Sequence, residues 1–424
     1  MTKYLPETLC IQAGYEPKNG ESRTVPIVQS TTYKYDDADE VADLFDLKKE
    51  GDMYTRISNP TVSALEKKVA TLEGGVAAVA TSSGQQANLI SILNICESGD
   101  EIIAMNNLYG GTITLLSSTI KKLGITTKFV PLNDFDALES AITEKTKLVF
   151  GETIANPGLE ILDLEKIAEV SHRHGLPVIV DNTFATPYLC RPFEYGIDIV
   201  THSSTKYLDG HAVAVGGLIV DSGSFNWEKN GYDSISAPDP NYHGLSYTQT
   251  FGSAAYAVKA KVVYIRDFGT PASPMNAFLT NLGVETLSLR MDRHSQNALA
   301  IAKYLSKHEK VEWIHYPGLE GDKYHELAKK YLPKGQSGVI SVGIRGGLEN
   351  TKKWINNLKL ATLVVHVGDV RTHVLHPASM THRQLSKEAL EKAGIKDNTV
   401  RLSVGIENVK DIIDDLEQAF ENID

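Results

Sequence analysis

Cysteine is scarce in this sequence, and long apolar runs are missing from it. Only Cys10, Cys96 and Cys190 occur in 424 residues. This odd number, without CxxC spacing, argues against a disulfide framework or a thiolate metal site. The N-terminal residues lack the apolar core of a signal peptide, and no apolar run reaches the length of a membrane span. These absences predict a cytoplasmic protein without a membrane partner.

Basic residues are fewer than acidic residues in this sequence. The chain has 42 Lys and Arg against 53 Asp and Glu, a net charge of -11, and it has no local basic patch. Such a chain repels nucleic-acid phosphates. The glycine motifs GxGxxG and GxxxxGK[ST] are absent, which argues against a dinucleotide or a nucleoside triphosphate. We therefore expect small-molecule partners and no nucleic acid.

The length and the hydropathy pattern predict three segments. A chain of 424 residues is long enough for a large domain and a smaller one. Residues 1–60 are polar, interrupted by proline and almost without periodicity, which predicts an arm laid on another surface. Residues 61–286 alternate short apolar runs with helical stretches, whereas residues 287–424 begin with a long helix and continue with strand-like runs.

The alternation in residues 61–286 predicts an α/β domain. A helix begins after Asn59 as cap and Pro60 in its first turn, and it ends at Gly74. Strands that alternate with helices form a mostly parallel sheet covered on both faces. Ligands on such sheets bind at the C-terminal ends of the strands. Residues 287–424 are expected to form a smaller α+β domain.

One lysine follows a predicted strand in the segment "DIVTHSSTKYLDGH". Ser203 and Thr205 supply hydroxyls that suit a phosphate, and partial burial lowers the pKa of Lys206, as a Schiff-base amine requires. The alternative is a surface turn with a solvated lysine.

A carboxylate ends the apolar strand in "PVIVDNTFATP". Burying Asp181 there is costly unless a cation meets it, and a protonated pyridine nitrogen is such a cation. The alternatives are a helix cap and a salt bridge to Arg173.

Two further turns lie at strand ends. In "VATSSGQQANLISIL", a small-residue turn leads into a helix whose free N–H groups, at Gly84 and Gln85, suit an anion. In "NLYGGT", Tyr109 can stack on a flat cofactor. Each turn alone is weak evidence, and an isolated tyrosine is more often packing.

Together these segments resemble the pyridoxal-5'-phosphate (PLP) enzymes of Cys/Met metabolism. The resemblance covers essentially the whole chain and includes "YTRISNPT", "SSGQQA", "YGGT", "TIANPGLEILDL", "HPASMTH" and "RLSVGIE". It implies a PLP-dependent transferase fold of type I, like that of aspartate aminotransferase. It also implies a homodimer as the minimal active unit, a homotetramer as the assembly, and residues 1–60 as an arm that reaches the neighbouring subunit.

The resemblance assigns a role to each site residue. Lys206 carries PLP as a Schiff base, Asp181 pairs with the pyridinium and Tyr109 stacks on the ring. The phosphate is held by Gly84, Gln85, Ser203 and Thr205, and by Tyr54 and Arg56 of the neighbouring subunit. The substrate is bound by Arg401, Asn156 and Thr372.

The chain departs from the family pattern near its C-terminal motifs. His366 stands where the family often has Ser in "SLG", and Thr372 stands where Ser often flanks the site. Four histidines, at 366, 373, 376 and 382, raise the alternative of a metal site, but no acidic partner or ligand spacing in the sequence supports one. We therefore expect no metal.

The segment 227–298 discriminates between branches of the family. It is longer than in the lyases and, with "RDFG" and "SPMNAFL", looks like the O-acetylhomoserine sulfhydrylase branch of methionine biosynthesis. That branch performs γ-replacement, in which Lys206 also acts as the base. A γ-lyase or a cystathionine γ-synthase on the same scaffold is the alternative. An acetyl or succinyl leaving group, and sulfide, cysteine or methanethiol as nucleophile, remain open at this point.

Overall fold

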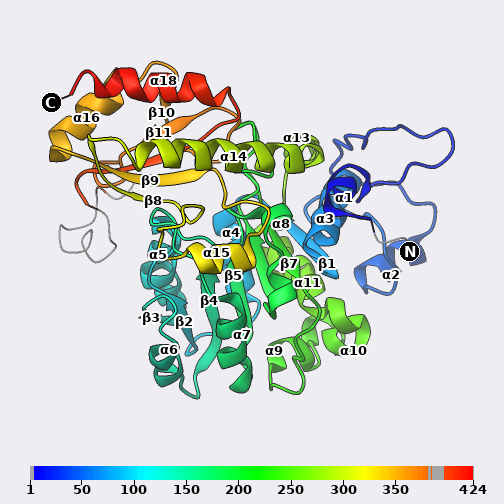
Figure 1. The fold of residues 1–424 in the computed structure, drawn as a ribbon. Coiled ribbons are helices and arrows are strands. Elements are labelled where there is room, and N and C mark those ends of the chain that lie inside the picture. The colour runs from blue at the N-terminus through cyan, green and yellow to red at the C-terminus, as the bar shows by residue number, and fades with distance from the viewer. Residues whose placement is uncertain (1–3, 381–382, 384–395, 424) are drawn as a thin grey trace.

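The protein is built on two β-sheets (Figure 1). The structure is a computed structural model, and it describes residues 4–380, 383 and 396–423. The larger sheet has the strand order β1-β7-β6-β5-β4-β2-β3. Its strands are β1 (Ala77–Thr81), β2 (Glu101–Met105), β3 (Thr126–Val130), β4 (Thr146–Glu152), β5 (Val178–Asp181), β6 (Ile199–His202) and β7 (Gly217–Asp221).

The direction of these strands confirms the predicted mostly parallel sheet. Only β7 runs against its neighbours β1 and β6, and the other pairs are parallel. The helices that connect and cover these strands are α3 (Pro60–Glu73), α4 (Gly84–Leu93), α5 (Gly110–Thr114), α6 (Phe135–Ala141), α7 (Leu164–Arg173), α8 (Thr186–Leu189), α9 (Asp233–Ser236), α10 (Tyr247–Phe251), α11 (Ala255–Lys259), α12 (Arg266–Phe268) and α13 (Pro274–Glu285).

The predicted capping of α3 is confirmed. The side chain of Asn59 accepts a hydrogen bond from the Thr61 amide at 3.0 Å, Pro60 occupies the first turn, and Gly74 ends the helix with φ of 81°. Proline lacks only an amide that has no partner in a first turn, and glycine adopts the left-handed conformation without strain.

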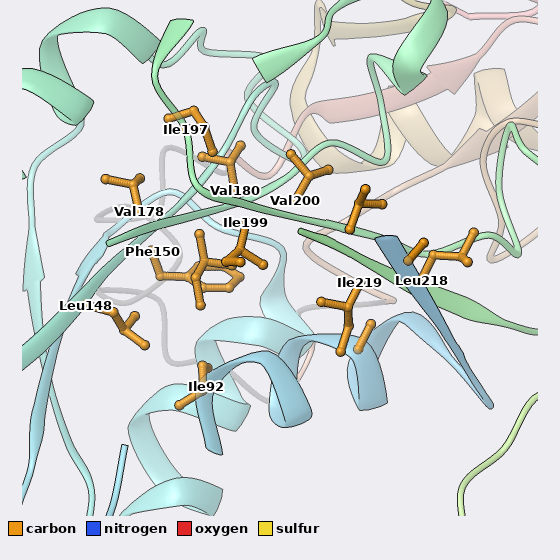
Figure 2. Close-up of a cluster of buried hydrophobic side chains, with 14 of the residues drawn as sticks. Ile92, Leu148, Phe150, Val178, Val180, Ile197, Ile199, Val200, Leu218 and Ile219 are labelled. Atoms are coloured by element: carbon orange, nitrogen blue, oxygen red, sulfur yellow. The ribbon is translucent and has the colours of Figure 1, made fainter. Parts of the chain in front are cut away.

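The main core lies between the central strands and α4. Phe150, Ile199 and Ile219 extend from neighbouring strands toward Ile92 of α4, and Val180 and Val200 extend from the opposite face of the sheet (Figure 2). All are essentially inaccessible to solvent. Burial of each such side chain contributes about 1.5–3 kcal/mol to the stability of the fold. The sheet therefore holds the residues at its strand ends in defined positions.

The second sheet has the order β10-β11-β12-β9-β8. Its elements are α14 (Leu287–Leu305), β8 (Val311–His315), α15 (His325–Tyr331), β9 (Val339–Ile344), α16 (Gly347–Asn357), β10 (Thr362–Leu363), β11 (His373–Leu375), β12 (Thr399–Ser403) and α18 (Val409–Phe420). The sequence suggests a domain boundary after residue 286, but the two apolar cores divide inside α14. Leu287 and Met291 belong to the first core, and Ala298 and Leu305 to the second.

The N-terminal segment differs in one respect from the predicted arm over residues 1–60. Helix α1 (Pro6–Gln12) packs on α3, α13 and α14 of its own chain, and Cys10 is completely buried there. After α1 the segment is largely exposed and carries one further helix, α2 (Ala38–Phe45). Across the described residues, every helix is too short or too polar to cross a membrane.

Candidate active site

A cavity of about 220 Å³ lies at the C-terminal ends of β1, β4, β5 and β6. Residues of the second sheet domain, Val365, His366, Val367 and Arg401, complete its wall. The cavity brings together nine of the residues selected from the sequence: Gly84, Gln85, Tyr109, Asn156, Asp181, Ser203, Thr205, Lys206 and Arg401.

Lys206 lies in a tight turn directly after β6. Its amide donates to the Ser203 carbonyl at 3.2 Å, and its side chain enters the cavity. Burial, together with the positive charge of Arg401, lowers the pKa of Lys206 to about 8. An amine with this pKa can hold or release a proton near neutral pH.

Asp181, the last residue of β5, is oriented by two neighbours. One carboxylate oxygen accepts from the Thr183 amide at 3.0 Å and from its hydroxyl, and the other accepts from the Asn88 amide group at 3.4 Å. The alternative salt bridge does not form, because Arg173 contacts Glu139 at 3.3 Å instead. The carboxylate is therefore held at the cavity wall, where it can meet a cationic ring nitrogen.

The start of α4 and the Lys206 turn together form an anion cradle. Helix α4 begins at Gly84 with Ser83 as its cap, so its first amides have no intrahelical acceptor. A Cβ atom on Gly84 would lie 2.6 Å from Cβ of Ser203. Glycine therefore allows the helix to approach the turn closely enough for both to contact one phosphate.

Tyr109 lines the cavity immediately before α5, whose Gly111 carbonyl accepts from the Gln85 side chain at 2.9 Å. The Tyr109 amide donates to Glu152 Oε1 at 2.7 Å, and its half-exposed ring packs over Gly111.

Glu152 lines the cavity but was not predicted from the sequence, although a carboxylate at the end of the apolar run in "KLVFGET" could have indicated it. Burial, reinforced by the charge of Asp181, raises the pKa of Glu152 well above its usual value.

Arg401 is a buried cation on β12. One guanidinium nitrogen donates to Asn156 Oδ1 at 3.0 Å and another to the His366 carbonyl at 3.2 Å, while Nε has no partner. Burial lowers the pKa of Arg401 to about 10. A partly satisfied guanidinium in a cavity can bind a carboxylate through two hydrogen bonds.

Three of the predicted residues lie away from this cavity. Thr372 is completely buried, and its hydroxyl donates to Glu407 at 2.9 Å and accepts from the Gly405 amide at 2.9 Å. Thr372 therefore does not line the cavity, because its hydroxyl is used inside the second domain, and its contact with substrate stays a prediction. Tyr54 and Arg56 are exposed on the arm, where Arg56 lies over the Tyr54 ring.

The histidines among residues 4–380 show no metal-binding arrangement. His376 hydrogen-bonds to Ser379 and the Asp397 carbonyl, and His382 lies outside the described residues. Elsewhere in the described chain, no group of three or more His, Cys, Asp or Glu side chains could hold an ion. His366, by contrast, lines the cavity.

Comparison with known proteins identifies the family. The profile of the family described as "Cys/Met metabolism PLP-dependent enzyme" matches residues 7–421. The chain is 46% identical to an O-acetyl-L-homoserine sulfhydrylase of Leptospira meyeri, over 99% of this chain and 97% of that protein. It is 48% identical to a homocysteine synthase of Schizosaccharomyces pombe, over 98% of both.

A solved structure agrees with this match. A Campylobacter jejuni protein assigned as an O-acetylhomoserine (thiol)-lyase, solved with N'-pyridoxyl-lysine-5'-monophosphate, superposes with a TM-score of 0.95. The two are 38% identical, and the match covers 99% of this chain and 100% of that one. The resemblance and the fold class inferred from the sequence are confirmed, and this chain belongs to the family of PLP-dependent enzymes of Cys/Met metabolism.

Proposed function

We propose that this enzyme replaces the γ-acetoxy group of O-acetyl-L-homoserine with sulfide, giving L-homocysteine and acetate. The observation that carries the proposal is a single cavity that holds a lysine amine of lowered pKa and a buried, partly satisfied arginine. Full-length relatives with 46% and 48% identity are named for this chemistry. We place the reaction in methionine biosynthesis in the cytoplasm.

The cavity residues fit PLP. The anion cradle of α4 and the Lys206 turn suits its phosphate, Asp181 suits its ring nitrogen, and the Tyr109 ring can cover its face. Bound there, PLP supplies an electron sink for charge that develops on substrate carbon atoms. Lys206, the only lysine that lines the cavity as described, is the residue to hold it.

The other tasks, substrate binding and proton transfer, fall to different side chains of the cavity. Arg401, supported by Asn156, binds the substrate carboxylate and fixes the orientation of the amino acid. Lys206, with a pKa of about 8, takes the Cα proton and later returns one. A proton leaves Cβ as acetate leaves Cγ, HS⁻ then adds at Cγ, and protons return to Cβ and Cα, so that HS⁻ is consumed and acetate is released.

We also propose that the active site is shared between two copies of the chain. Tyr54 and Arg56 are exposed on the arm and do not line their own cavity, and the Arg56 guanidinium donates to the Arg266 carbonyl of its own chain. They are suited to contact the phosphate of a neighbouring copy. Further support comes from α1 and the start of α14, which pack together and leave Leu5 and Leu289 more than two-thirds exposed. The assembly that we propose is a homodimer as the minimal active unit, paired into a homotetramer, with these two leucines as candidate contacts.

Product identification tests the function. Purified holoenzyme is given O-acetyl-L-homoserine with sulfide, with cysteine or with methanethiol, and the products are identified by mass spectrometry. Homocysteine as the fastest product supports the proposal. Faster cystathionine formation, or release of a keto acid from methionine without a nucleophile, contradicts it and indicates a γ-synthase or a γ-lyase. A parallel series with O-succinyl-L-homoserine identifies the leaving group.

A further inference from the structure

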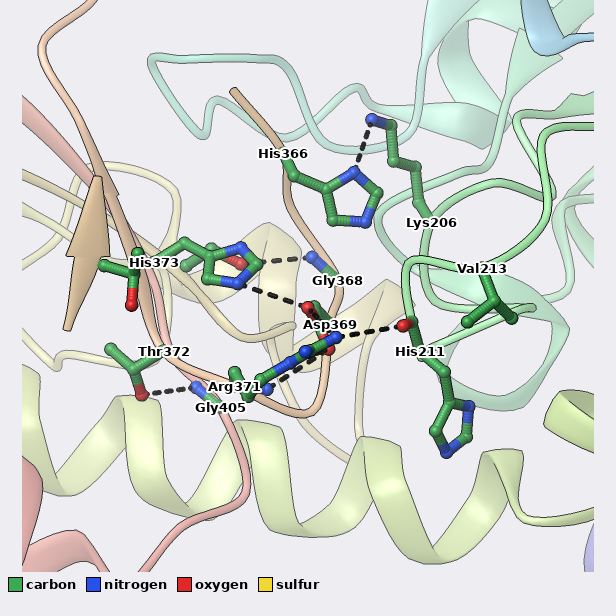
Figure 3. A network of polar contacts seen from close by, with 12 residues as sticks. Lys206, His211, Val213, His366, Gly368, Asp369, Arg371, Thr372, His373 and Gly405 are labelled. Atoms are coloured by element: carbon green, nitrogen blue, oxygen red, sulfur yellow. Dashed lines mark hydrogen bonds and ion pairs between the residues drawn. The ribbon is translucent and has the colours of Figure 1, made fainter. Parts of the chain in front are cut away.

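The loop between β10 and β11 is pressed against the backbone of the catalytic lysine. Gly368 has φ of 76°, and a Cβ atom there would lie 2.8 Å from the Tyr207 amide nitrogen and 3.2 Å from the carbonyl carbon of Lys206. Nearby, the Val370 amide donates to the Gly210 carbonyl at 3.0 Å. The loop therefore has one fixed position relative to Lys206 (Figure 3).

Held on this loop, His366 contacts both Lys206 and Arg401. Its Nδ1 lies 3.3 Å from Nζ of Lys206, and its carbonyl accepts from Arg401 at 3.2 Å. Its imidazole lies between Lys206 and the second sheet domain (Figure 3). No role assigned above to the cavity residues uses this side chain.

The surroundings keep the imidazole neutral. The charged and titratable groups that face it are Lys206 after β6, Arg401 on β12, His373 on β11 and Asp369 on its own loop. Burial, Lys206 and His373, in that order, lower the pKa of His366 to about 4, Asp369 opposes them with a smaller effect, and Arg401 adds to the lowering. Asp369 is instead engaged by Arg371 at 2.9 Å and His373 at 3.2 Å. A neutral ring can accept a hydrogen bond at Nδ1.

We propose that His366 is a positioning residue for the γ-replacement reaction, accepting an N–H of Lys206 whenever that amine is free and so aiming its lone pair at the substrate. This inference rests on the proposed function. A lysine side chain has several rotatable bonds and no preferred direction at its end. A hydrogen bond to His366 Nδ1 restricts the rotation of the Lys206 amine. The lone pair on the amine nitrogen stays available to take the Cα proton.

Two substitutions separate hydrogen-bond acceptance from other effects of the ring. His366→Asn keeps a neutral acceptor close to the position of Nδ1, whereas His366→Leu has similar bulk and no acceptor. We expect His366→Leu to lower kcat about 10- to 100-fold, as small misplacements of reacting groups do, with KM for the amino acid changed much less. His366→Asn should stay within about threefold of the native kcat, since the same acceptor is retained.

The matched control is His211→Leu. His211 is exposed on the neighbouring loop, and its ring points away from Lys206 (Figure 3). This variant should behave as the native enzyme. Equal losses of kcat in His366→Asn and His366→Leu, or a His366→Leu enzyme within twofold of native, would overturn the proposal.

A second measurement does not depend on turnover. In the cofactor-free protein, the rate at which Lys206 is acetylated by limiting acetic anhydride is followed by peptide mass spectrometry across pH. The acceptor stabilises the protonated amine, so His366→Leu should move the labelling midpoint of Lys206 to lower pH, and His366→Asn should not. An unmoved midpoint in His366→Leu contradicts the inference. Because no substrate takes part, this result is independent of which reaction the holoenzyme performs.

Discussion

At the scale of single residues, two buried lysines show that a lowered pKa alone does not identify a catalytic amine. Burial lowers the pKa of Lys259, as of Lys206, to about 8. Lys259, however, donates to the Asn94 carbonyl at 2.9 Å and does not line the cavity. Only the amine that faces the cavity can meet the aldehyde of the cofactor.

This contrast gives the first prediction. Borohydride reduction of the holoenzyme, followed by peptide mapping, should place the pyridoxyl group on Lys206 alone. Lys206→Ala should abolish turnover even if PLP still binds. A pyridoxyl group on Lys259 in the native enzyme would refute the assignment, and Lys259→Met serves as the control that keeps the label on Lys206.

The second residue-scale prediction concerns Arg401. Arg401→Lys keeps the charge but loses the planar pair of donors. A hydrogen bond to a charged group contributes about 1.5–3 kcal/mol, so kcat/KM for O-acetyl-L-homoserine should fall about 10- to 100-fold. PLP content, measured by absorbance, should stay within error of native. Unchanged kinetics would rule out carboxylate binding by this residue.

At the scale of elements, the close approach of α4 to the Lys206 turn depends on the absence of one side chain. Gly84→Ala places a methyl group 2.6 Å from Cβ of Ser203, so the helix must move away from the turn. We expect the dissociation constant for PLP to rise about tenfold or more, the equivalent of one charge-assisted hydrogen bond, while far-ultraviolet circular dichroism is unchanged. Gly321→Ala, where nothing lies within 4 Å of the added methyl group, is the control. Equal PLP affinity in both variants would show that the cradle is not the phosphate site.

Elements were easier to predict than the partners of individual side chains. The Asn59 cap, the Gly74 stop and the strand ends that carry Asp181 and Lys206 all follow from local patterns, since short-range sterics and hydrogen bonds determine them. Thr372 could not be placed in this way, because its hydroxyl partner, Glu407, is 35 residues away. The contact between His366 and Lys206 spans 160 residues and likewise leaves no local signal.

At the scale of the whole molecule, shared sites predict complementation between inactive chains. A guanidinium binds phosphate strongly, and a two-fold interface makes the exchange reciprocal. Arg56→Ala and Lys206→Ala subunits should each be inactive, but a mixed dimer has one site with both lesions and one with neither. Random exchange at equal amounts should therefore restore up to about one quarter of native activity.

The control for this experiment mixes Lys206→Ala with Asp181→Ala. Both residues line the cavity of one chain, so every site in a mixed dimer keeps one lesion and no activity should return. Recovery in the control, or none in the Arg56 mixture, would mean that the arm does not complete a neighbouring site.

Helix α14 couples the unfolding of the two domains. Its 19 residues span about 28 Å, and its two ends are anchored in different apolar cores. Neither core can melt without exposing part of a helix that the other core stabilises. Heat should therefore denature both domains in one cooperative calorimetric peak, and limited proteolysis should release no stable fragment cut within residues 287–305.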